Sequence, residues 1–309
     1  MMKYLLSVDG GGTKTEFCIS DSYGNIFGSV ITGSSSFKAS DLRQSSEQLR
    51  KGMEQLKSKY QITSKDIIKG VFGMSGYDSE KDRAVILDQI LQLGFTEEQI
   101  FLCNDGVLAF YAQTQEPGIV VISGTGSIVI GVDKKGEIIR SGGWGYHFSD
   151  IGSGYWIGCE ILKRTLLYCD HCCAYDPIFT NVKDYFGAEE MKELPYKVTE
   201  IRNAYQIADL SYEVVNAADS NNKLALDILK QGAEHLADQT NGMYQQLDIN
   251  DETLQIVFSG GVLSSQIYDK LLKSSIVSKI DRRPIRFFTQ ERRPSFGGIK
   301  LAGRLLGRR

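Results

Sequence analysis

The sequence predicts an α/β protein with two domains, because a strand, turn, strand and hairpin unit occurs twice along the chain. Thr13 precedes Gly24 by the same number of residues as Thr125 precedes Gly136. Apolar runs flank these positions in both copies, at 4–8, 16–19 and 26–30, and again at 119–122, 128–130 and 137–139. We expect two related half-molecules, each of which offers one small-residue turn as half of a phosphate clamp.

Composition agrees with a soluble, two-domain protein. A chain of 309 residues with 42% apolar and 24% charged residues can build two cores of ordinary size. A net charge of −3 argues against nucleic acid or an anionic membrane as a partner. No apolar run approaches the ~20 residues of a membrane span. The first strand follows Met1-Met2-Lys3 directly and leaves no room for a signal peptide, so we expect a cytoplasmic protein.

Helices and strands alternate between the two repeated units. Periodicity predicts a helix over 40–60, a strand over 67–74, a helix over 79–93, a strand over 100–103 and a helix from 105 to about 115. Glu116-Pro117-Gly118 then marks a turn and a domain boundary.

The remainder of the chain is mostly helical. Helices are predicted near 153–170, 176–186, 198–218 and 221–247, followed by a strand at 254–258, a helix from Ser264, a strand at 285–288 and a helix at 296–306.

The Gly-rich turns can bind phosphate. Asp9-Gly-Gly-Gly-Thr13 opens a strand rather than a helix, so it is not a dinucleotide fingerprint, and it lacks the ending of a Walker A loop. Backbone N–H groups of Gly11 and Gly12, the Thr13 hydroxyl and the Lys14 charge can hold phosphate oxygens. Asp9 would repel phosphate unless a cation lay between them, which predicts Mg²⁺ bound through water. The alternative is that such turns are only hairpin chemistry.

The six cysteines are expected to be reduced thiols in a cytoplasmic protein. Cys169-Asp-His-Cys172-Cys173 alone resembles a ligand cluster, but it lacks the second, distant ligand pair of a closed zinc site. Metal binding by this segment therefore stays open.

A wider set of motifs resembles a known family. It comprises Asp9-Gly-Gly-Gly-Thr13-Lys-Thr15, Asn104-Asp105, Ser123-Gly-Thr-Gly-Ser127, Gly143-Trp-Gly145, Asp150-x-Gly-Ser-x-Tyr-Trp-Ile157 and Ser259-Gly-Gly261. Together, over residues 4 to about 303, they resemble the N-acetylglucosamine kinase group of the BadF-type ATPases, within the sugar kinase, actin and Hsp70 superfamily. The resemblance implies an actin-like fold of two ribonuclease-H-like domains with ATP in a cleft. It also implies a C-terminal helix that returns to the first domain, giving domains of 1–117 plus 296–309 and 118–295.

The resemblance also assigns roles to residues. It implies that Asp105 is the catalytic base. The phosphate and nucleotide positions are Thr13, Gly124, Thr125, Gly126, Ala208, Gly260, Gly261 and Ser264. The sugar positions are Gly143, Trp144, Gly145 and Asp150. Alternative structural roles are an N-cap for Asp105 and a core aromatic for Trp144.

The chemistry of Asp105 agrees with this assignment independently. It follows a strand and precedes a helix, where α/β proteins place functional groups. Phosphoryl transfer needs an in-line hydroxyl nucleophile, and a carboxylate can accept the proton of that hydroxyl.

Two departures from the family pattern leave the sugar open. The family has a sugar-binding Asn after the first hairpin unit, but this chain has Gly33-Ser-Ser-Ser-Phe37, with Ser36 or Phe37 at the aligned position. The family also commonly has an acidic residue directly after Asp150, where this chain has Ile151. We expect an ATP-dependent kinase that phosphorylates a hydroxyl, the 6-hydroxyl by resemblance, of N-acetylglucosamine, N-acetylmuramic acid or both.

Three alternatives stay open. They are a glucosamine kinase, an ATPase activator of an acyl-CoA dehydratase or reductase, and a nucleotide-dependent regulatory module without sugar turnover. The activator would need a cysteine-bound iron–sulfur cluster. A homodimer is expected only as the commonest oligomer.

Overall fold

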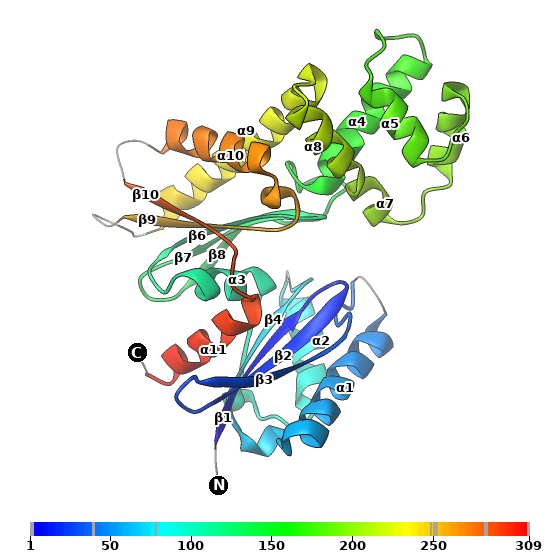
Figure 1. Cartoon of the computed structure of the whole chain (residues 1–309). Coiled ribbons are helices and arrows are strands. Elements are labelled where there is room, and N and C mark those ends of the chain that lie inside the picture. Colours follow the sequence, from blue (N-terminus) through cyan, green and yellow to red (C-terminus); the bar gives the residue numbers. More distant parts are fainter. Residues whose placement is uncertain are drawn as a thin grey trace. The chain divides into compact units, whose positions relative to one another are not determined.

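The structure, a computed structural model, describes residues 3–38, 41–77, 79–247, 249, 253–280 and 284–307 (Figure 1). The chain forms two compact units. Unit 1 comprises Met1–Gln115 and Gln290–Arg309, and unit 2 comprises Glu116–Thr289. Both divisions fall a few residues before the expected boundaries. The second division precedes its expected position because residues 291–293, just before the last helix, bond to Gln113 and Glu16 of unit 1.

Unit 1 contains a five-stranded sheet in the order β3-β2-β1-β4-β5. The strands are β1 (Tyr4–Gly10), β2 (Lys14–Asp21), β3 (Ile26–Gly33), β4 (Ile67–Met74) and β5 (Ile100–Cys103). β1, β2 and β3 pair antiparallel, whereas β4 runs parallel to β1 and β5 runs parallel to β4. β1, β4 and β5 therefore end at the same edge of the sheet.

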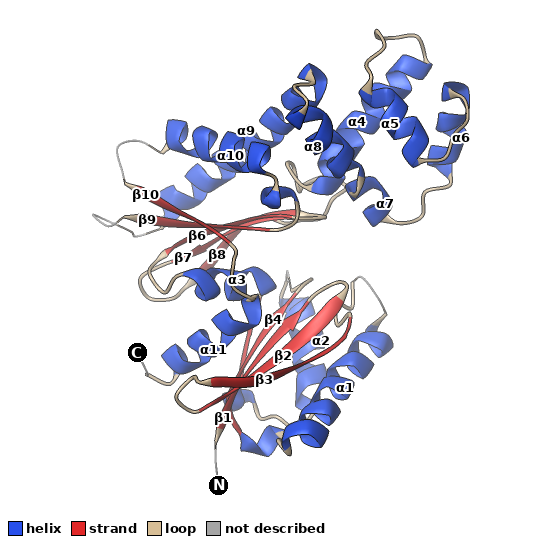
Figure 2. Cartoon of the chain, viewed as in Figure 1, coloured by secondary structure: helices blue, strands red, loops and turns tan. Residues whose placement is uncertain are grey.

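Two helix pairs cover the faces of this sheet (Figure 2). α1 (Leu42–Tyr60) and α2 (Glu80–Leu91) pack on the face that carries Leu6, Val8 and Phe17. α3 (Asp105–Gln113) and α11 (Pro294–Leu305) cover the other face, where a Cβ on Gly298 would clash with Ser7. Side chains alternate along a strand, so Asp9 shares the face of Ser7. The C-terminal helix thus packs within unit 1.

Unit 2 repeats the same sheet pattern in the order β10-β9-β6-β7-β8. Its strands are β6 (Gly118–Ser123), β7 (Ser127–Val132), β8 (Ile138–Gly142), β9 (Leu254–Ser259) and β10 (Ile285–Thr289). Again three consecutive strands pair antiparallel and two further strands are added parallel. The predicted repeat and the α/β fold class are confirmed.

The helices of unit 2 surround one large core with β6, β7 and β9, to which all of them except α7 contribute side chains. They are α4 (Gly154–Cys169), α5 (Ile178–Tyr185), α6 (Leu194–Thr199), α7 (Ala204–Ala208), α8 (Leu210–Asp219), α9 (Lys223–Gln246) and α10 (Gln266–Lys279). None of the helices in the described ranges is long and apolar enough to cross a membrane.

The single helix predicted over 198–218 is wrong. The chain forms α6, α7 and α8 there, because the Asn203 side chain accepts a hydrogen bond from the Tyr205 N–H at 2.8 Å and starts a new helix. α7 then packs closely on α4, where a Cβ on Gly158 would clash with the Ile207 carbonyl. The helix predicted from Ser264 begins at Gln266 instead, with Ser265 as its N-cap.

Candidate active site

The β1–β2 turn of unit 1 presents Thr13 and Lys14 to solvent. The Gly11 N–H donates to the Lys14 carbonyl at 2.9 Å and closes the turn, with Gly12 and Thr13 at its tip. The Thr13 and Lys14 side chains are exposed. In this geometry the Thr13 hydroxyl and the Lys14 ammonium group can approach an anion.

The segment after β3 is fastened to this turn. The Ser34 hydroxyl donates to the Gly11 carbonyl at 3.2 Å. Thr15 Oγ1 lies 2.8 Å from the Gly33 carbonyl and 2.7 Å from Ser35 Oγ. Ser36, the predicted substrate-binding residue, is buried and its N–H donates to Ser34 Oγ at 3.3 Å. The segment that departs from the family pattern therefore lies beside the turn.

Asp9 lies at the end of β1 in an unfavourable setting for a charge. Burial, the negative charge of Asp105 and that of Glu16 raise the pKa of Asp9 to about 7, and the Lys14 ammonium opposes them. Glu16 faces Asp9 directly across the β1–β2 pair. Asp105 follows β5 at the same edge of the sheet, near enough for its charge to act on the Asp9 carboxyl.

Asp105 is the first residue of α3. The capping role falls to Asn104, whose side chain accepts from the Gly106 N–H at 2.9 Å. Asp105 Oδ1 also lies 3.1 Å from that N–H. Asp105 is thus not the N-cap, and its carboxylate lies at the sheet edge where β5 ends.

Mg²⁺ suits these residues. The charges of Asp105 and Glu16 raise the pKa of Asp9, and a divalent cation bound at Asp9 would offset that repulsion. Oxygen ligands are also what Mg²⁺ prefers. Mg²⁺ commonly uses only one or two carboxylates together with water and phosphate oxygens. Across the described residues, 169–173 included, no group of three or more His, Cys, Asp or Glu side chains is arranged to hold a metal.

The β6–β7 turn of unit 2 is held against the start of α4. The Gly124 N–H donates to the Gly126 carbonyl at 2.9 Å. The Gly154 N–H donates to the Gly124 carbonyl at 2.7 Å, and the Tyr155 N–H donates to the Thr125 carbonyl at 3.1 Å. The turn carrying Thr125 is therefore a rigid element of unit 2.

Asp150 lies against this second turn. Its side chain is 7% exposed, and a Cβ on Gly126 would lie 2.6 Å from Asp150 Oδ2. Ser127 Oγ donates to the Ile151 carbonyl at 3.1 Å and Ser123 Oγ to the Gly152 carbonyl at 2.7 Å. The predicted sugar-binding carboxylate and the predicted phosphate turn are thus in contact within unit 2.

Trp144 is an exposed aromatic, so the alternative that it belongs to the core is wrong. Its side chain is 69% exposed, and the Arg140 guanidinium lies 4.2 Å from its ring centroid. Arg140 Nη2 also donates to the carbonyls of Gly142 and Gly143, at 3.0 and 2.6 Å. Gly143 and Gly145 both have positive φ, at 68° and 104°. Arg140 therefore fixes the chain that presents Trp144.

The residues predicted for adenosine adjoin the same turn. Gly260 has a φ of 104°, and a Cβ there would clash with the Ser123 carbonyl and lie 2.9 Å from the Gly124 nitrogen. A Cβ on Gly154 would lie 3.1 Å from the carbonyl oxygens of both Ala208 and Gly124. Gly124, Ala208 and Gly260, which are far apart in the sequence, are therefore neighbours.

Two residues were not singled out from the sequence, Tyr212 in this region and Glu16 in unit 1. Tyr212 of α8 is 59% exposed, and its hydroxyl would lie 3.6 Å from a Cβ on Gly261. The Ser264 hydroxyl donates to the Gly261 carbonyl at 2.6 Å and fixes that turn. An aromatic residue on the polar side of a helix is the signal that points to Tyr212. Glu16 is the second residue, signalled by a carboxylate within an otherwise apolar strand.

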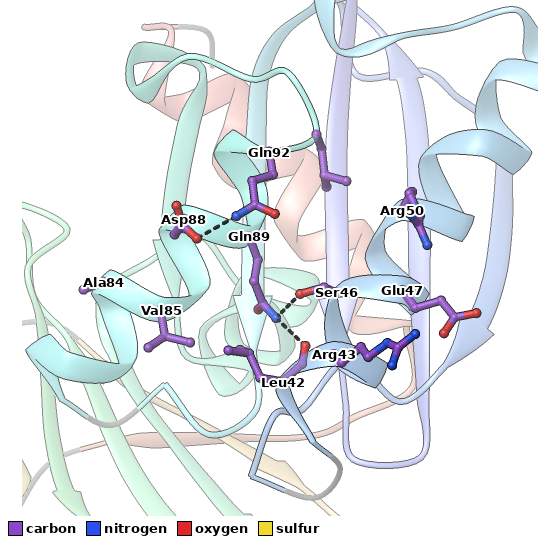
Figure 3. A pocket seen from close by; sticks show the side chains of 11 residues that line it. Leu42, Arg43, Ser46, Glu47, Arg50, Ala84, Val85, Asp88, Gln89 and Gln92 are labelled. Carbon is purple, nitrogen blue, oxygen red and sulfur yellow. Dashed lines mark hydrogen bonds between the residues drawn. The ribbon is translucent and has the colours of Figure 1, made fainter.

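A separate groove lies between α1 and α2 and contains none of the predicted site residues (Figure 3). Gln89 bridges the two helices there, donating to Ser46 Oγ at 2.7 Å and to the Leu42 carbonyl at 3.2 Å. The phosphate turns lie elsewhere, so we assign this groove no part in the site.

Comparison with known proteins identifies the family. Residues 6–292 match the model of the BadF/BadG/BcrA/BcrD ATPase family. The chain belongs to this family. The family resemblance predicted from the sequence motifs is confirmed.

Curated relatives of this BadF-family chain are similar over nearly its whole length. The N-acetylmuramic acid/N-acetylglucosamine kinase of Clostridium acetobutylicum is 27% identical over 305 residues, 97% of this chain and 98% of the relative. The N-acetyl-D-glucosamine kinase of Dictyostelium discoideum is 28% identical over 313 residues, 96% of this chain and 97% of the relative. The glucosamine kinase GspK of Vibrio cholerae is 25% identical over 236 residues, 75% and 77% of the two chains.

Solved structures share the fold. A Chromobacterium violaceum protein assigned as an N-acetylglucosamine kinase gives a TM-score of 0.76 at 24% identity, covering 97% of this chain and 99% of that one. A ROK family glucokinase from Streptomyces griseus gives 0.57 at 12% identity, covering 98% and 100%. The predicted actin-like fold of this BadF-family chain is confirmed.

Proposed function

We propose that the chain is an ATP-dependent amino-sugar kinase. It transfers the γ-phosphoryl group of ATP to a hydroxyl, the 6-hydroxyl, of N-acetylglucosamine, N-acetylmuramic acid or both. The observation that carries this proposal is that parallel strands bring Asp9, at the end of β1, and Asp105, after β5, to one edge of the unit 1 sheet beside the exposed β1–β2 turn. A base for the acceptor hydroxyl then lies next to the groups that handle phosphate and metal. The full-length similarity to kinases named for these two sugars supports the same choice.

The phosphates are held by the two turns. Thr13 and Lys14 supply a hydroxyl and an ammonium group in unit 1. Thr125 with the adjoining N–H groups forms a second turn suited to phosphate, within unit 2. Asp9 would hold Mg²⁺ through water, and the cation would supply positive charge to offset that of the phosphate oxygens. Gly260, Gly261, Ser264 and Ala208 contact the adenosine side, with Tyr212 as an exposed ring beside them.

The sugar is held by a carboxylate, an aromatic ring and a hydroxyl group. Asp150 accepts hydrogen bonds from sugar hydroxyls, while Trp144 offers an exposed aromatic face fixed by Arg140. Ser36 takes the place of the family's amide side chain. Asp105 accepts the proton of the acceptor hydroxyl as that oxygen attacks the γ-phosphorus in line, and ADP leaves.

The proposal includes a cytoplasmic location, where ATP and amino sugars are both available. A homodimer remains an expectation. Glucosamine is the alternative acceptor, supported by similarity to a glucosamine kinase over three quarters of the chain.

The test is a coupled ADP-release assay with Mg·ATP and one sugar at a time. The panel comprises N-acetylglucosamine, N-acetylmuramic acid, glucosamine, N-acetylmannosamine and glucose. Phosphorus NMR of the product then locates the new phosphate. ADP release that is the same with and without every sugar would contradict the proposal. An ATPase activator would be recognised by iron content and colour of the purified protein.

A further inference from the structure

The chain returns from unit 2 to unit 1 through residues 290–293, here called the return segment, and this segment is bonded to β2. Glu16 of β2 is only 5% exposed. Its Oε1 accepts from Arg293 Nη1 at 3.1 Å, and its Oε2 accepts from the Ser295 hydroxyl at 3.1 Å. Both carboxylate oxygens of Glu16 are therefore engaged by the start of α11 and the residue before it.

Glu16 in turn faces Asp9. The two residues are direct partners in the antiparallel β1–β2 ladder, so their side chains lie on the same face of the sheet about 5 Å apart at Cβ. The charge of Glu16 reaches the Asp9 carboxyl and helps to raise its pKa. Two contacts thus connect the return segment with the residue proposed to manage the metal.

The return segment is also bonded to the far end of α3, the helix that Asp105 begins. With its amide oriented to satisfy both groups, the Gln113 side-chain oxygen accepts from the N–H groups of Arg292 at 3.0 Å and Glu291 at 3.2 Å. Arg304 Nη1 donates to the Gln115 carbonyl at 2.9 Å. The chain therefore leaves unit 1 and returns to it at one place, and both proposed catalytic carboxylates are connected to that place.

Stability does not account for the buried Glu16. Removing the Glu16 carboxylate from water is costly, and its partner Arg293 is 63% exposed, so solvent screens the attraction that offsets this cost. The Glu16–Arg293 ion pair is better explained by a role in fixing the position of the return segment against β2.

We propose that Glu16 is a positioning residue that, through Arg293 and Ser295, couples the return segment to the β1–β2 turn. Displacement of the return segment then shifts Asp9 and the turn together. The inference rests on the proposed function, since it assumes that nucleotide binds at this turn and that sugar binding in unit 2 must be communicated to it.

The variant that tests this coupling is Glu16→Gln combined with Arg293→Met. Removing both charges leaves no uncompensated carboxylate, so folding is preserved better than with Arg293→Met alone. Arg292→Met is the matched control, because Arg292 is the adjacent exposed arginine and contacts Gln113 through its backbone N–H. Arg293→Lys keeps a charged donor and is expected to restore the coupling in part.

The first measurement is amide hydrogen exchange with and without Mg²⁺ and a non-hydrolysable ATP analogue. In the unaltered protein we expect slower exchange both in 10–15 and in 290–296 when nucleotide binds. In the double variant, protection of 10–15 persists and protection of 290–296 falls about 2- to 30-fold, the range seen for residues that transmit between sites. Unchanged exchange of 290–296 in the unaltered protein would overturn the inference.

The second measurement is the ratio of sugar-dependent ADP release to ATP hydrolysis without sugar. We expect a fall of about 2- to 30-fold in the double variant and none in Arg292→Met. A lower melting temperature with an unchanged ratio would show a purely structural role and overturn the inference. Failure of the proposed function is seen separately, as absence of sugar-dependent ADP release in the unaltered protein, while the exchange measurement uses no sugar.

Discussion

Burial and the nearby negative charge of Asp105 raise the pKa of Asp9 to about 7, with a smaller contribution from Glu16. Asp9 comes from the end of β1 and Asp105 from the start of α3, directly after β5. β1, β4 and β5 run parallel, so they deliver both carboxyl groups to the same edge of the sheet. The parallel part of the unit 1 sheet thus builds a local excess of negative charge beside a turn that carries Thr13 and Lys14.

Asp105→Asn is expected to abolish phosphoryl transfer while leaving ATP binding largely intact. An amide cannot accept the hydroxyl proton, and loss of a general base costs about 10²- to 10⁴-fold in rate. Steady-state kinetics and calorimetric titration with ATP measure the two effects. Near-normal turnover in this variant would show that Asp105 is not the base.

Asp9→Asn is expected to make the protein more stable than the unaltered chain at pH 8. The folded-state pKa of Asp9 is raised from 3.8 to about 7, so the protonated form stabilises the fold below pH 4 and this contribution is lost as the pH rises through 7. The full difference amounts to at most about 4 kcal/mol. Melting temperatures from pH 4 to pH 8 should diverge between the two proteins as the pH rises, and parallel curves would contradict the burial of this charge.

Gly124→Ala is expected to weaken ATP binding without unfolding the protein. A Cβ at Gly124 would have no protein atom within 4 Å, so the fold tolerates it. Gly242→Ala in α9 of the same unit meets equally open space and is the control. If phosphate approaches the β6–β7 turn, only the first variant loses ATP affinity, by about tenfold or more for one displaced charge-assisted hydrogen bond. Equal ATP affinities in the two variants would remove the turn from the nucleotide site.

Trp144→Ala is expected to raise the KM for the amino sugar by about tenfold or less, and to leave ATP affinity unchanged, because only the exposed aromatic face is lost. Arg140→Met should produce a smaller change in the same direction, since Arg140 fixes the chain before Trp144 rather than touching the sugar. KM values for sugar and ATP, measured separately, check both. A rise confined to the KM for ATP would contradict the assignment.

The sequence predicts local and repeated features of this fold well. Strands β4 and β5 have their predicted bounds, and the two hairpin units recur because alternation and turn residues act over a few neighbours. The break of 198–218 into three helices was missed, since it depends on the Asn203 cap and on close packing against Gly158. Tertiary contact overrides helical periodicity there.

The candidate site could be predicted only in part, for a related reason. Motifs locate the turns and Asp105, yet the contact of Glu16 with Arg293 spans 277 positions and leaves no local pattern. The proximity of Asp150 to Gly126 likewise follows from folding of the 150–152 loop onto the second turn. The roles of these residues remain predictions.

The most direct test of the amino-sugar kinase is ADP release with Mg·ATP in the presence and absence of N-acetylglucosamine or N-acetylmuramic acid, with Asp105→Asn in parallel. We predict sugar-dependent ADP release, one sugar phosphate formed per ADP, and loss of that release in the variant. Tight ATP binding with no sugar that accelerates ADP release would contradict the account.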